Sequence, residues 1–250
     1  MKFETPDWHD SLPSTNSTLI DWIRGGDDLP HGYVLATYEQ TAGRGRFDRK
    51  WVAPAGQNLT FSFLVAVPQS NTQATSITMA VALGIVDYLN SIGLSAQTKW
   101  PNDVWLNGRK ISGILAEICE SRHRPERMIV VGIGLNVNLP ESEATNIDRP
   151  ATSMLIESGS EYKVSQVLDD LLPHLGTHLD VWAEQEFVGI RDQWTENCLY
   201  VGEPVCIGDE DNVSTGVLEG FGSHGQALLR LEDGSVKEIW AGDLSLRGST

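Results

Sequence analysis

A short basic loop is the segment of this chain whose residue types are best suited to hold an anion. Two glycines alternate with arginines and further basic residues follow: Gly43, Arg44, Gly45, Arg46, Arg49 and Lys50. The whole chain has a formal net charge of −16, so four basic residues beside the single acid Asp48 make a local exception. Glycine lets the backbone approach a ligand closely, and arginines and free amides donate hydrogen bonds to phosphate or carboxylate. The pattern predicts an anion-binding loop, although a solvated surface loop explains this segment equally well when it is taken alone.

The segment from Lys99 to Asp103, with the sequence KWPND, combines a lysine, an amide and a carboxylate around a proline. Pro101 removes a backbone donor and ends the preceding strand, so Lys99 and Asn102 are expected where a sheet meets a cleft. A lysine in that position can bridge two anions, whereas most lysines are solvated surface residues. We interpret Lys99 as the second candidate for binding an anionic substrate.

Small residues alternate along the run from Gly132 to Asn138. The run lacks the GxGxxG spacing of dinucleotide-binding folds and continues as a strand, which argues against that class. Glycines in a strand indicate that a ligand lies flat against it, and Gly113 has the same character. Asn136 is then placed to pair with a base or ribose edge.

Both helices and strands must position these residues. Ser14 and Thr15 precede an amphipathic stretch that ends in glycine, which predicts a capped helix. Asn107 and Gly108 stand between two strand-like runs and predict a tight hairpin. Further strands are expected at residues 33–38, 59–67 and 127–138, and helices at residues 77–89 and 164–186, the last bent or broken at Pro173. This order predicts an α+β fold with a mixed, mainly antiparallel sheet and packed helices.

The character of the chain changes near residues 198–202. Four short strand-like pieces follow, at residues 204–207, 214–221, 227–231 and 236–240, and glycine-containing turns separate them. Short strands at this spacing predict a small β-barrel. We therefore expect two domains, at residues 1–199 and 200–250.

Composition excludes several classes of protein. The chain has no apolar run long enough to cross a membrane and no signal sequence at its start, so a cytoplasmic protein is expected. Three scattered cysteines indicate a reducing compartment rather than a disulfide framework. His174 and His178 share a helical spacing without the acid of an HExxH site, so no metal site is predicted. The net charge of −16 argues against binding nucleic acid.

Four of these motifs together resemble the biotin–protein ligase family in order and spacing: GRGR at 43–46, KWPND at 99–103, GILAE at 113–117 and GIGLN at 132–136. The resemblance includes Ser14 to Asn16 and Gln40, and reaches residues 225–229 and 240–247. It implies a class II synthetase-like catalytic fold followed by a small SH3-like β-barrel. Family members that repress transcription have a winged helix-turn-helix before the Ser-Thr-Asn element. Only thirteen residues precede Ser14 here, so DNA binding is not expected.

The resemblance also implies an activity. Biotin and ATP would form biotinyl-5'-AMP with release of pyrophosphate, and biotin would pass to a lysine of the biotin carboxyl carrier protein of acetyl-CoA carboxylase. The positions that match the family's biotin site are Ser14, Thr15, Asn16, Gln40, Gly43, Gly45, Arg46, Lys99 and Gly113. Those that match ATP or adenylate contacts are Arg44, Arg46, Arg49, Trp51, Lys99 and Asn136. Lys99 and Arg46 would be the catalytic cations, and Mg²⁺ would arrive on the ATP phosphates.

Several alternatives stay open. Asp103 is a possible base for the attacking lysine, or a turn carboxylate beside Pro101. A lipoate–protein ligase shares the adenylate chemistry with a different acyl group. A non-enzymatic adaptor with a degenerate ligase body is a rival of another class. The chain is expected to be a monomer or a homodimer, and the loop from Gly43 to Lys50 is expected to close over the intermediate.

Overall fold

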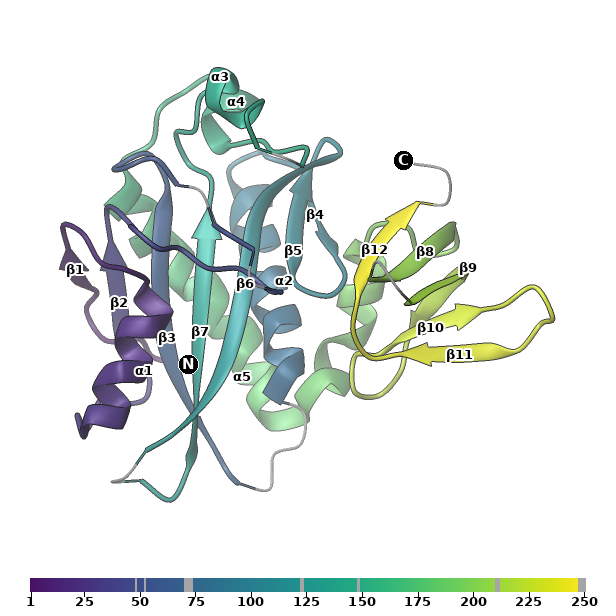
Figure 1. Cartoon of the computed structure of the whole chain (residues 1–250), viewed down its shortest axis with the longest axis horizontal. Helices are drawn as coiled ribbons and strands as arrows, with labels where there is room; N and C mark the ends of the chain where they lie inside the picture. The colour runs from purple at the N-terminus through teal and green to yellow at the C-terminus, as the bar shows by residue number, and fades with distance from the viewer. Residues whose placement is uncertain are drawn as a thin grey trace.

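A computed structural model describes residues 1–47, 49–51, 53–69, 74–121, 124–147, 149–209 and 212–246. Its first part is a seven-stranded sheet in the order β1-β2-β3-β7-β6-β5-β4 (Figure 1). The strands are β1 (Asp7–His9), β2 (Val34–Thr37), β3 (Leu59–Val67), β4 (Ala96–Lys99), β5 (Asp103–Leu106), β6 (Arg109–Glu120) and β7 (Arg127–Leu135). Only β1 and β2 pair in parallel among these neighbours; the other pairs are antiparallel. The predicted mixed, mainly antiparallel sheet is confirmed.

Helices cover both faces of this sheet. The covering helices are α1 (Thr15–Gly25), α2 (Ile77–Ser91) and α5 (Val164–Asn197). The 3-10 helix η1 (Ala74–Ser76) precedes α2, and the short helices α3 (Glu141–Ala144) and α4 (Met154–Ser158) lie beyond one end of the sheet (Figure 1). In Figure 1, α1 lies in front of the sheet, and α2 and α5 lie behind it. Along β3, Phe61 and Phe63 pack in the core beneath α2 and α5, whereas Leu64 packs with α1. Burial on both faces explains why β3 is a nearly continuous apolar run.

The helix cap and the tight turn predicted near the cleft are both present. Ser14 is the N-cap of α1, and Gly26 ends that helix in the left-handed conformation. Asn107 and Gly108 both have positive φ, as the tight turn between β5 and β6 requires. The predicted start of α1 and the predicted hairpin between β5 and β6 are therefore confirmed.

The long helix α5 differs from the prediction. It continues through Pro173 and extends to Asn197, and its one non-helical residue is Glu186, with φ 53° and ψ −148°. The expected break at Pro173 is therefore wrong, whereas the expected end at residue 186 agrees with the kink at Glu186, beyond which a second helical segment runs to Asn197. A proline can remain within a helix where tertiary packing holds the helix in place. Leu171 and Leu175, on either side of Pro173, are both fully buried.

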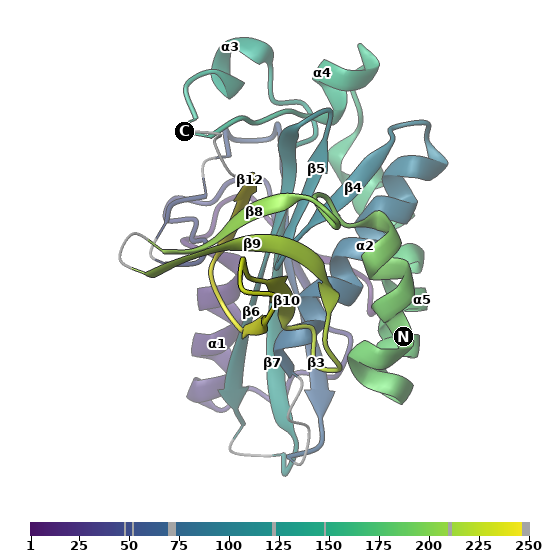
Figure 2. The same ribbon diagram turned by 90° about the vertical axis from the view of Figure 1, so that its right-hand side faces the viewer.

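A second, five-stranded antiparallel sheet follows in the order β11-β10-β9-β8-β12. Its strands are β8 (Pro204–Asp209), β9 (Asn212–Phe221), β10 (Ala227–Arg230), β11 (Val236–Ile239) and β12 (Asp243–Leu246). The last of these was not expected from the sequence. Figure 2 shows β8 and β9 crossing in front of the first sheet. The pairings of the described residues form an open row of strands and include none that would close a barrel.

The two sheets share one core. Phe221 of β9 packs edge-on against Phe187 and Trp194 of α5. The indole nitrogen of Trp100 donates a hydrogen bond to the carbonyl of Gly225 at 2.9 Å. This contact attaches the second sheet beside the KWPND segment. The division at residues 1–199 and 200–250 stays our proposal, with a continuous apolar interface between the two parts.

Among the described residues, no helix is both long and apolar enough to cross a membrane.

Candidate active site

A cleft with about 1140 Å³ of space, its open mouth included, lies on the α1 face of the first sheet. Its floor is made by β6 and β7, where Gly113 lies opposite Gly134 and Leu115 lies opposite Gly132. A Cβ atom at Gly134 would clash with the indole of Trp51, and one at Gly132 would clash with the amide of Asn16. The alternating glycines are therefore needed because other groups lie directly on this floor.

One end of the cleft is an uncharged hydrogen-bonding cluster at the start of α1. The backbone amide of Thr15 donates to Gln40 Oε1 at 2.8 Å. The hydroxyl of Ser62 lies 2.6 Å from both Thr15 Oγ1 and Asn16 Oδ1. Ser14, Thr15 and Asn16 are all buried. The structure thus brings together the four predicted residues of this end, and adds Ser62.

Ser62 was missed although a signal was present. It is a polar residue in the middle of the apolar strand β3 and lies on the same face as Thr60. A buried hydroxyl in such a strand needs a hydrogen-bonding partner, so its presence predicts a polar cluster on that face.

The carboxylate of Glu117 joins this cluster to the basic loop. Asn16 donates through Nδ2 to Glu117 Oε2 at 2.8 Å. The same carboxylate accepts from Arg44 at 3.1 Å. Glu117, which ends the GILAE motif, therefore ties the first arginine of the loop to the helix start.

The basic loop folds over the cleft. Arg44 and Lys50 form an isolated antiparallel bridge, and the amide of Gly45 donates to the carbonyl of Arg49 at 2.7 Å. Arg46 points inward and donates to Asn102 Oδ1 at 3.0 Å. Burial lowers the pKa of the Arg46 guanidinium from its ordinary value. Of the predicted loop residues, all of those described except Gly43 and Phe47 line the cleft, namely Arg44, Gly45, Arg46, Arg49, Lys50 and Trp51. Asp48 lies outside the described residues.

Asp243, the first residue of β12, holds two arginines at the mouth of the cleft. Its Oδ2 accepts from Arg49 at 2.6 Å and from Arg149 at 3.2 Å. Burial opposes ionisation of this carboxyl, but the hydrogen bonds and charges of the two arginines outweigh it and lower its pKa. Asp243 therefore joins the basic loop, residues near 149 and the second sheet at one point. No local sequence signal announces this contact, because the partners lie 194 and 94 residues apart.

The opposite end of the cleft carries an unsatisfied acceptor. Asn136 is buried, and its Nδ2 donates to the carbonyl of Thr152 at 2.9 Å. Its Oδ1 has no hydrogen-bond partner among the described residues, and neither has the indole nitrogen of Trp51. A buried polar atom without a partner is costly unless a ligand satisfies it. Asn136 and Trp51 therefore suit a flat ligand that offers a hydrogen-bond donor.

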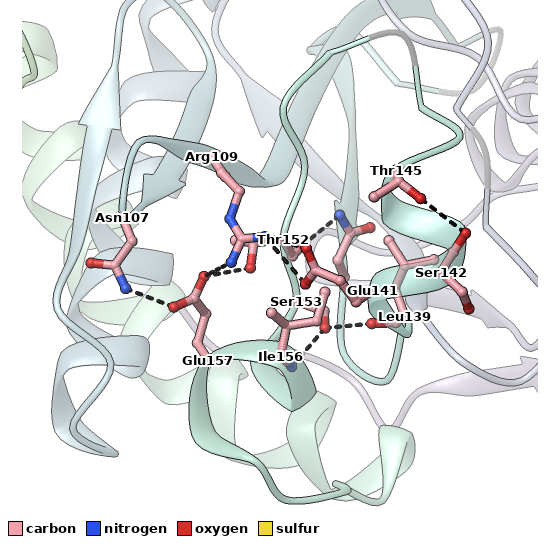
Figure 3. A network of polar contacts seen from close by, with 11 residues as sticks. Asn107, Arg109, Leu139, Glu141, Ser142, Thr145, Thr152, Ser153, Ile156 and Glu157 are labelled. Atoms are coloured by element: carbon pink, nitrogen blue, oxygen red, sulfur yellow. Dashed lines mark hydrogen bonds and ion pairs between the residues drawn. The ribbon is translucent and has the colours of Figure 1, made fainter.

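A polar network supports this end of the cleft (Figure 3). Arg109 pairs with Glu157 at 3.0 Å and with Glu141 at 3.0 Å. Glu157 also accepts from the hydroxyl of Thr152 and, at 2.6 Å, from the amide of Asn107. Since Thr152 holds Asn136 through its carbonyl, the network connects the β5–β6 turn and α4 to the unsatisfied acceptor.

Lys99 lies behind the cleft, close enough to feel the charges of Asp103 and Lys110. It is absent from the described residues that line the cleft, and its ammonium lies 3.8 Å from the centre of the Trp105 ring. Burial lowers the pKa of Lys99 to about 8, against the attraction of Asp103. Lys99 ends β4, the outermost strand of the sheet, which is separated from the glycine floor by β5. Asn102 lines the cleft, and a contact of Lys99 with a bound substrate stays a prediction.

Lys110 is a second lysine near the cleft. It lines the cleft, and its Nζ lies 2.7 Å from Asp103 Oδ1. Its ammonium is also next to the point where a Cβ on Gly113 would fall. The sequence contained no signal for Lys110, because residues three apart on a regular strand face opposite sides of the sheet, and the register between β5 and β6 shifts between Lys110 and Ser112. Lys110 and Arg46 are thus the cations available near the middle of the floor.

The described residues contain no group of three or more His, Cys, Asp or Glu side chains able to hold a metal ion. The two carboxylates that line the cleft, Asp103 and Asp243, each pair with basic side chains. These paired carboxylates are therefore better suited to Mg²⁺ that is already bound to the phosphates of ATP than to a metal ion held by protein side chains alone.

Comparison with known proteins agrees with this geometry. The family model of the biotin/lipoate A/B protein ligase family matches residues 8–136. A biotin–[acetyl-CoA-carboxylase] ligase of Paracoccus denitrificans is 33% identical over 88% of this chain and 92% of its own length. The bifunctional ligase/repressor BirA of Escherichia coli is 28% identical over 95% of this chain and 73% of its own length. The chain therefore belongs to the biotin/lipoate A/B protein ligase family.

A solved structure narrows the assignment. A biotin protein ligase from Aquifex aeolicus in complex with biotin and ATP has a TM-score of 0.82 and 31% identity, and the match covers 98% of this chain and 99% of that one. Within the family, this chain groups with the biotin–protein ligases.

Proposed function

We propose that this protein activates biotin with ATP to biotinyl-5'-AMP and transfers biotin to a lysine of a biotin carboxyl carrier protein. The observation that carries the proposal is the order of groups along one cleft. An uncharged hydrogen-bonding cluster stands at one end, two cations stand near the middle, and an unsatisfied amide oxygen stands at the other. Biotin, a carboxylate with its phosphate partner, and adenine need these groups in this order.

The uncharged end suits the ureido ring of biotin. Ser14, Thr15, Asn16, Gln40 and Ser62 offer donors and acceptors without a net charge. The sulfur-containing ring and valeryl chain would then lie on the glycine floor, where Gly113 and Gly132 leave room once side chains shift. The carboxylate would point towards the loop that carries Arg46.

The first half-reaction places a carboxylate oxygen of biotin against the α-phosphorus of ATP. A P–O bond forms to the carboxylate as the bond to pyrophosphate breaks, so negative charge builds on the phosphorus oxygens. Arg46 and Lys110 supply the compensating charge, and the enzyme otherwise acts by holding two anions together. We assign the catalytic lysine to Lys110 instead of Lys99 because Lys110 lines the cleft. Mg²⁺ carried on the ATP phosphates would neutralise part of the remaining charge.

The adenine would take the end formed by Trp51 and Asn136. Its exocyclic amine can donate to Asn136 Oδ1, which lacks a partner. The indole of Trp51 lies over Gly134, so the base would need to share or take over that space. Arg44 and Arg49 then lie on the loop above the phosphate and ribose.

In the second half-reaction, the ε-amine of the carrier lysine attacks the biotinyl carbonyl and AMP leaves. The name of the Paracoccus denitrificans relative supports acetyl-CoA carboxylase as the source of the carrier. Asp103 stays the candidate base, but a proton on its carboxylate would compete with its ion pair to Lys110.

The experiment that tests this function is pyrophosphate exchange into ATP, measured with biotin and separately with lipoate. Exchange that depends on biotin, followed by a mass increase of a carrier domain, is the expected result. Exchange with lipoate alone would favour a lipoate–protein ligase. No exchange with either acid, together with intact folding, would favour the adaptor.

The cellular location, the partners and the oligomeric state of the protein are predictions as well. We place it in the cytoplasm, without a nucleic-acid partner, in a protein that is a monomer or a homodimer. Light scattering with and without biotinyl-5'-AMP tests the oligomeric state.

A further inference from the structure

Arg46 also lines a second hollow. It is a groove with about 800 Å³ of space, its open side included, between the first sheet and the C-terminal sheet. Met79, Trp100 and Pro101 line it from the first part of the chain, and Trp240 and Ala241 line it from the second. We call it the inter-sheet groove. Figure 2 shows β8 and β9 of the C-terminal sheet in front of the first sheet.

The inter-sheet groove is continuous with the cleft. Arg46, Asn102, Ile114 and Leu115 line both hollows. The hydrogen bond from Arg46 to Asn102, 3.0 Å long, stands at the point where they meet. If biotin and ATP bind as proposed, the reacting carbonyl lies beside Arg46 and can be approached from the groove.

Ion pairs border the mouth of the cleft on two sides. Arg44 is held by Glu117 on one side of the loop, and Arg49 is held by Asp243 on the other. Asp243 also holds Arg149. An acceptor side chain that entered there would have to pass these ion pairs while the loop still shields the anhydride from water.

We propose that the inter-sheet groove admits the lysine side chain of the acceptor protein to the biotinyl carbonyl. This inference rests on the proposed function and specifies which surface receives the second substrate. The occupant is one extended lysine with the backbone on either side of it. Nothing larger is needed, because the reaction requires only the ε-amine.

The chemistry of the groove suits an amine that must become neutral. Among its described lining residues none is Asp or Glu, and Arg46 is the only Lys or Arg. An ammonium held there loses hydration, gains no carboxylate partner and faces a positive charge. Each of these effects lowers the pKa of a lysine. The neutral amine then uses its lone pair to form the C–N bond as the C–O bond to AMP breaks, and the extra proton leaves to AMP or water.

The rim of the groove offers a contact for the incoming cation. Trp240 is 62% exposed, a large fraction for a tryptophan, and its ring lies 5.9 Å from that of His224. An indole face attracts an ammonium by about 0.5–1 kcal/mol at an exposed site. The alkyl part of the lysine can then pack on Met79 and Trp100 further inside.

The test separates the two half-reactions in the full-length protein. Ala241→Phe adds bulk in the groove, and Val236→Phe adds comparable bulk on β11, at a residue 47% exposed that does not line the groove. Biotin-dependent pyrophosphate exchange measures adenylate formation. Transfer is measured on a biotin carboxyl carrier domain and on N-α-acetyl-lysine amide as a minimal probe.

We expect Ala241→Phe to lower transfer to both acceptors at least tenfold and to leave exchange within twofold of the original protein. Val236→Phe should change neither rate. Transfer by Ala241→Phe at the original rate would overturn the groove proposal. If only the carrier domain were affected and the small probe were not, the groove would be a docking surface and not the route of the lysine, which also overturns the proposal.

Trp240→Ala provides an independent variant in case Ala241→Phe disturbs Arg46 and lowers exchange. We expect an increase of about threefold in KM for the carrier domain, with exchange unchanged. An unchanged KM would then count against the proposal. Absence of biotin-dependent exchange in the unsubstituted protein would instead refute the proposed function, so the two failures are distinguishable.

Discussion

The ammonium of Lys110 lies 2.7 Å from a carboxylate oxygen of Asp103, and the two residues come from neighbouring strands on the cleft side of the sheet. This ion pair holds the lysine beside the glycine floor. Lys99, on the outermost strand, is instead packed against Trp105. The two lysines therefore differ in what they can contact.

Lys110→Met should lower the rate of biotin-dependent pyrophosphate exchange by about 10²- to 10³-fold, because it removes one preorganised cation from the charge that develops at phosphorus. Lys99→Met is the matched control and should change the rate less than threefold. Steady-state exchange at saturating ATP and biotin distinguishes them. A large loss from Lys99→Met with a small loss from Lys110→Met would restore the original assignment.

Asp103→Asn should lower exchange and transfer by a similar factor, about tenfold, because it releases Lys110, which serves both steps. If Asp103 were mainly the base for the attacking lysine, only transfer would fall. Single-turnover transfer from preformed biotinyl-5'-AMP, compared with exchange, separates these roles. The pH profile of transfer should keep its acidic limb in Asp103→Asn if Asp103 acts through Lys110.

Asp243→Asn should weaken closure of the basic loop, because it removes the charge that holds Arg49 and Arg149 together. We expect KM for ATP to rise about three- to tenfold, with faster proteolytic cleavage of the loop in the substrate-free protein. Asp233→Asn is the control, since Asp233 is a fully exposed turn residue of the same C-terminal sheet. Equal proteolysis rates in the two variants would contradict a role of Asp243 in closure.

Glu157→Gln should raise KM for ATP about fivefold and leave KM for biotin unchanged. Its side chain is only 8% exposed and connects Arg109 to Thr152, whose carbonyl holds Asn136. Glu141→Gln removes the other partner of Arg109, but that carboxylate is 59% exposed, so its loss should have little effect. A parallel rise in both KM values, or equal effects of the two variants, would indicate general destabilisation instead of positioning of the adenine end.

Lys99 should make stability depend on pH in the alkaline range. Its pKa is lowered from 10.5 to about 8 in the folded protein. Between these values the unfolded chain binds a proton that the folded chain has released, so the free energy of unfolding rises with pH. The rise is at most about 3 kcal/mol, and less where solvent reaches the ammonium. Below pH 8 the cost of burying the charge is present in full.

Urea unfolding at several pH values measures this effect. Lys99→Met should remove the rise between pH 8 and pH 10.5, whereas the exposed Lys163→Met should leave it in place. The same slope in the original protein and in Lys99→Met would show that other groups cause it.

Residue order alone was enough to predict the elements around the cleft. The cap at Ser14, the Asn107-Gly108 turn and the apolar run of β3 depend on contacts within a few residues, so local chemistry specifies them. The same holds for the basic loop and the alternating glycines, whose residue types limit what can lie beside them. The chain's membership of the biotin/lipoate A/B protein ligase family follows from the order and spacing of these same segments.

Only the tertiary structure decided which lysine reaches the cleft and what holds the loop. Lys99 and Lys110 are both strand lysines near a turn, and the order of β4, β5 and β6 in the sheet determines which one faces the glycines. The path of α5 through Pro173 and the contacts of Asp243 likewise depend on distant packing. Such features arise from segments separated by tens to hundreds of residues, and no local pattern encodes the distance between them.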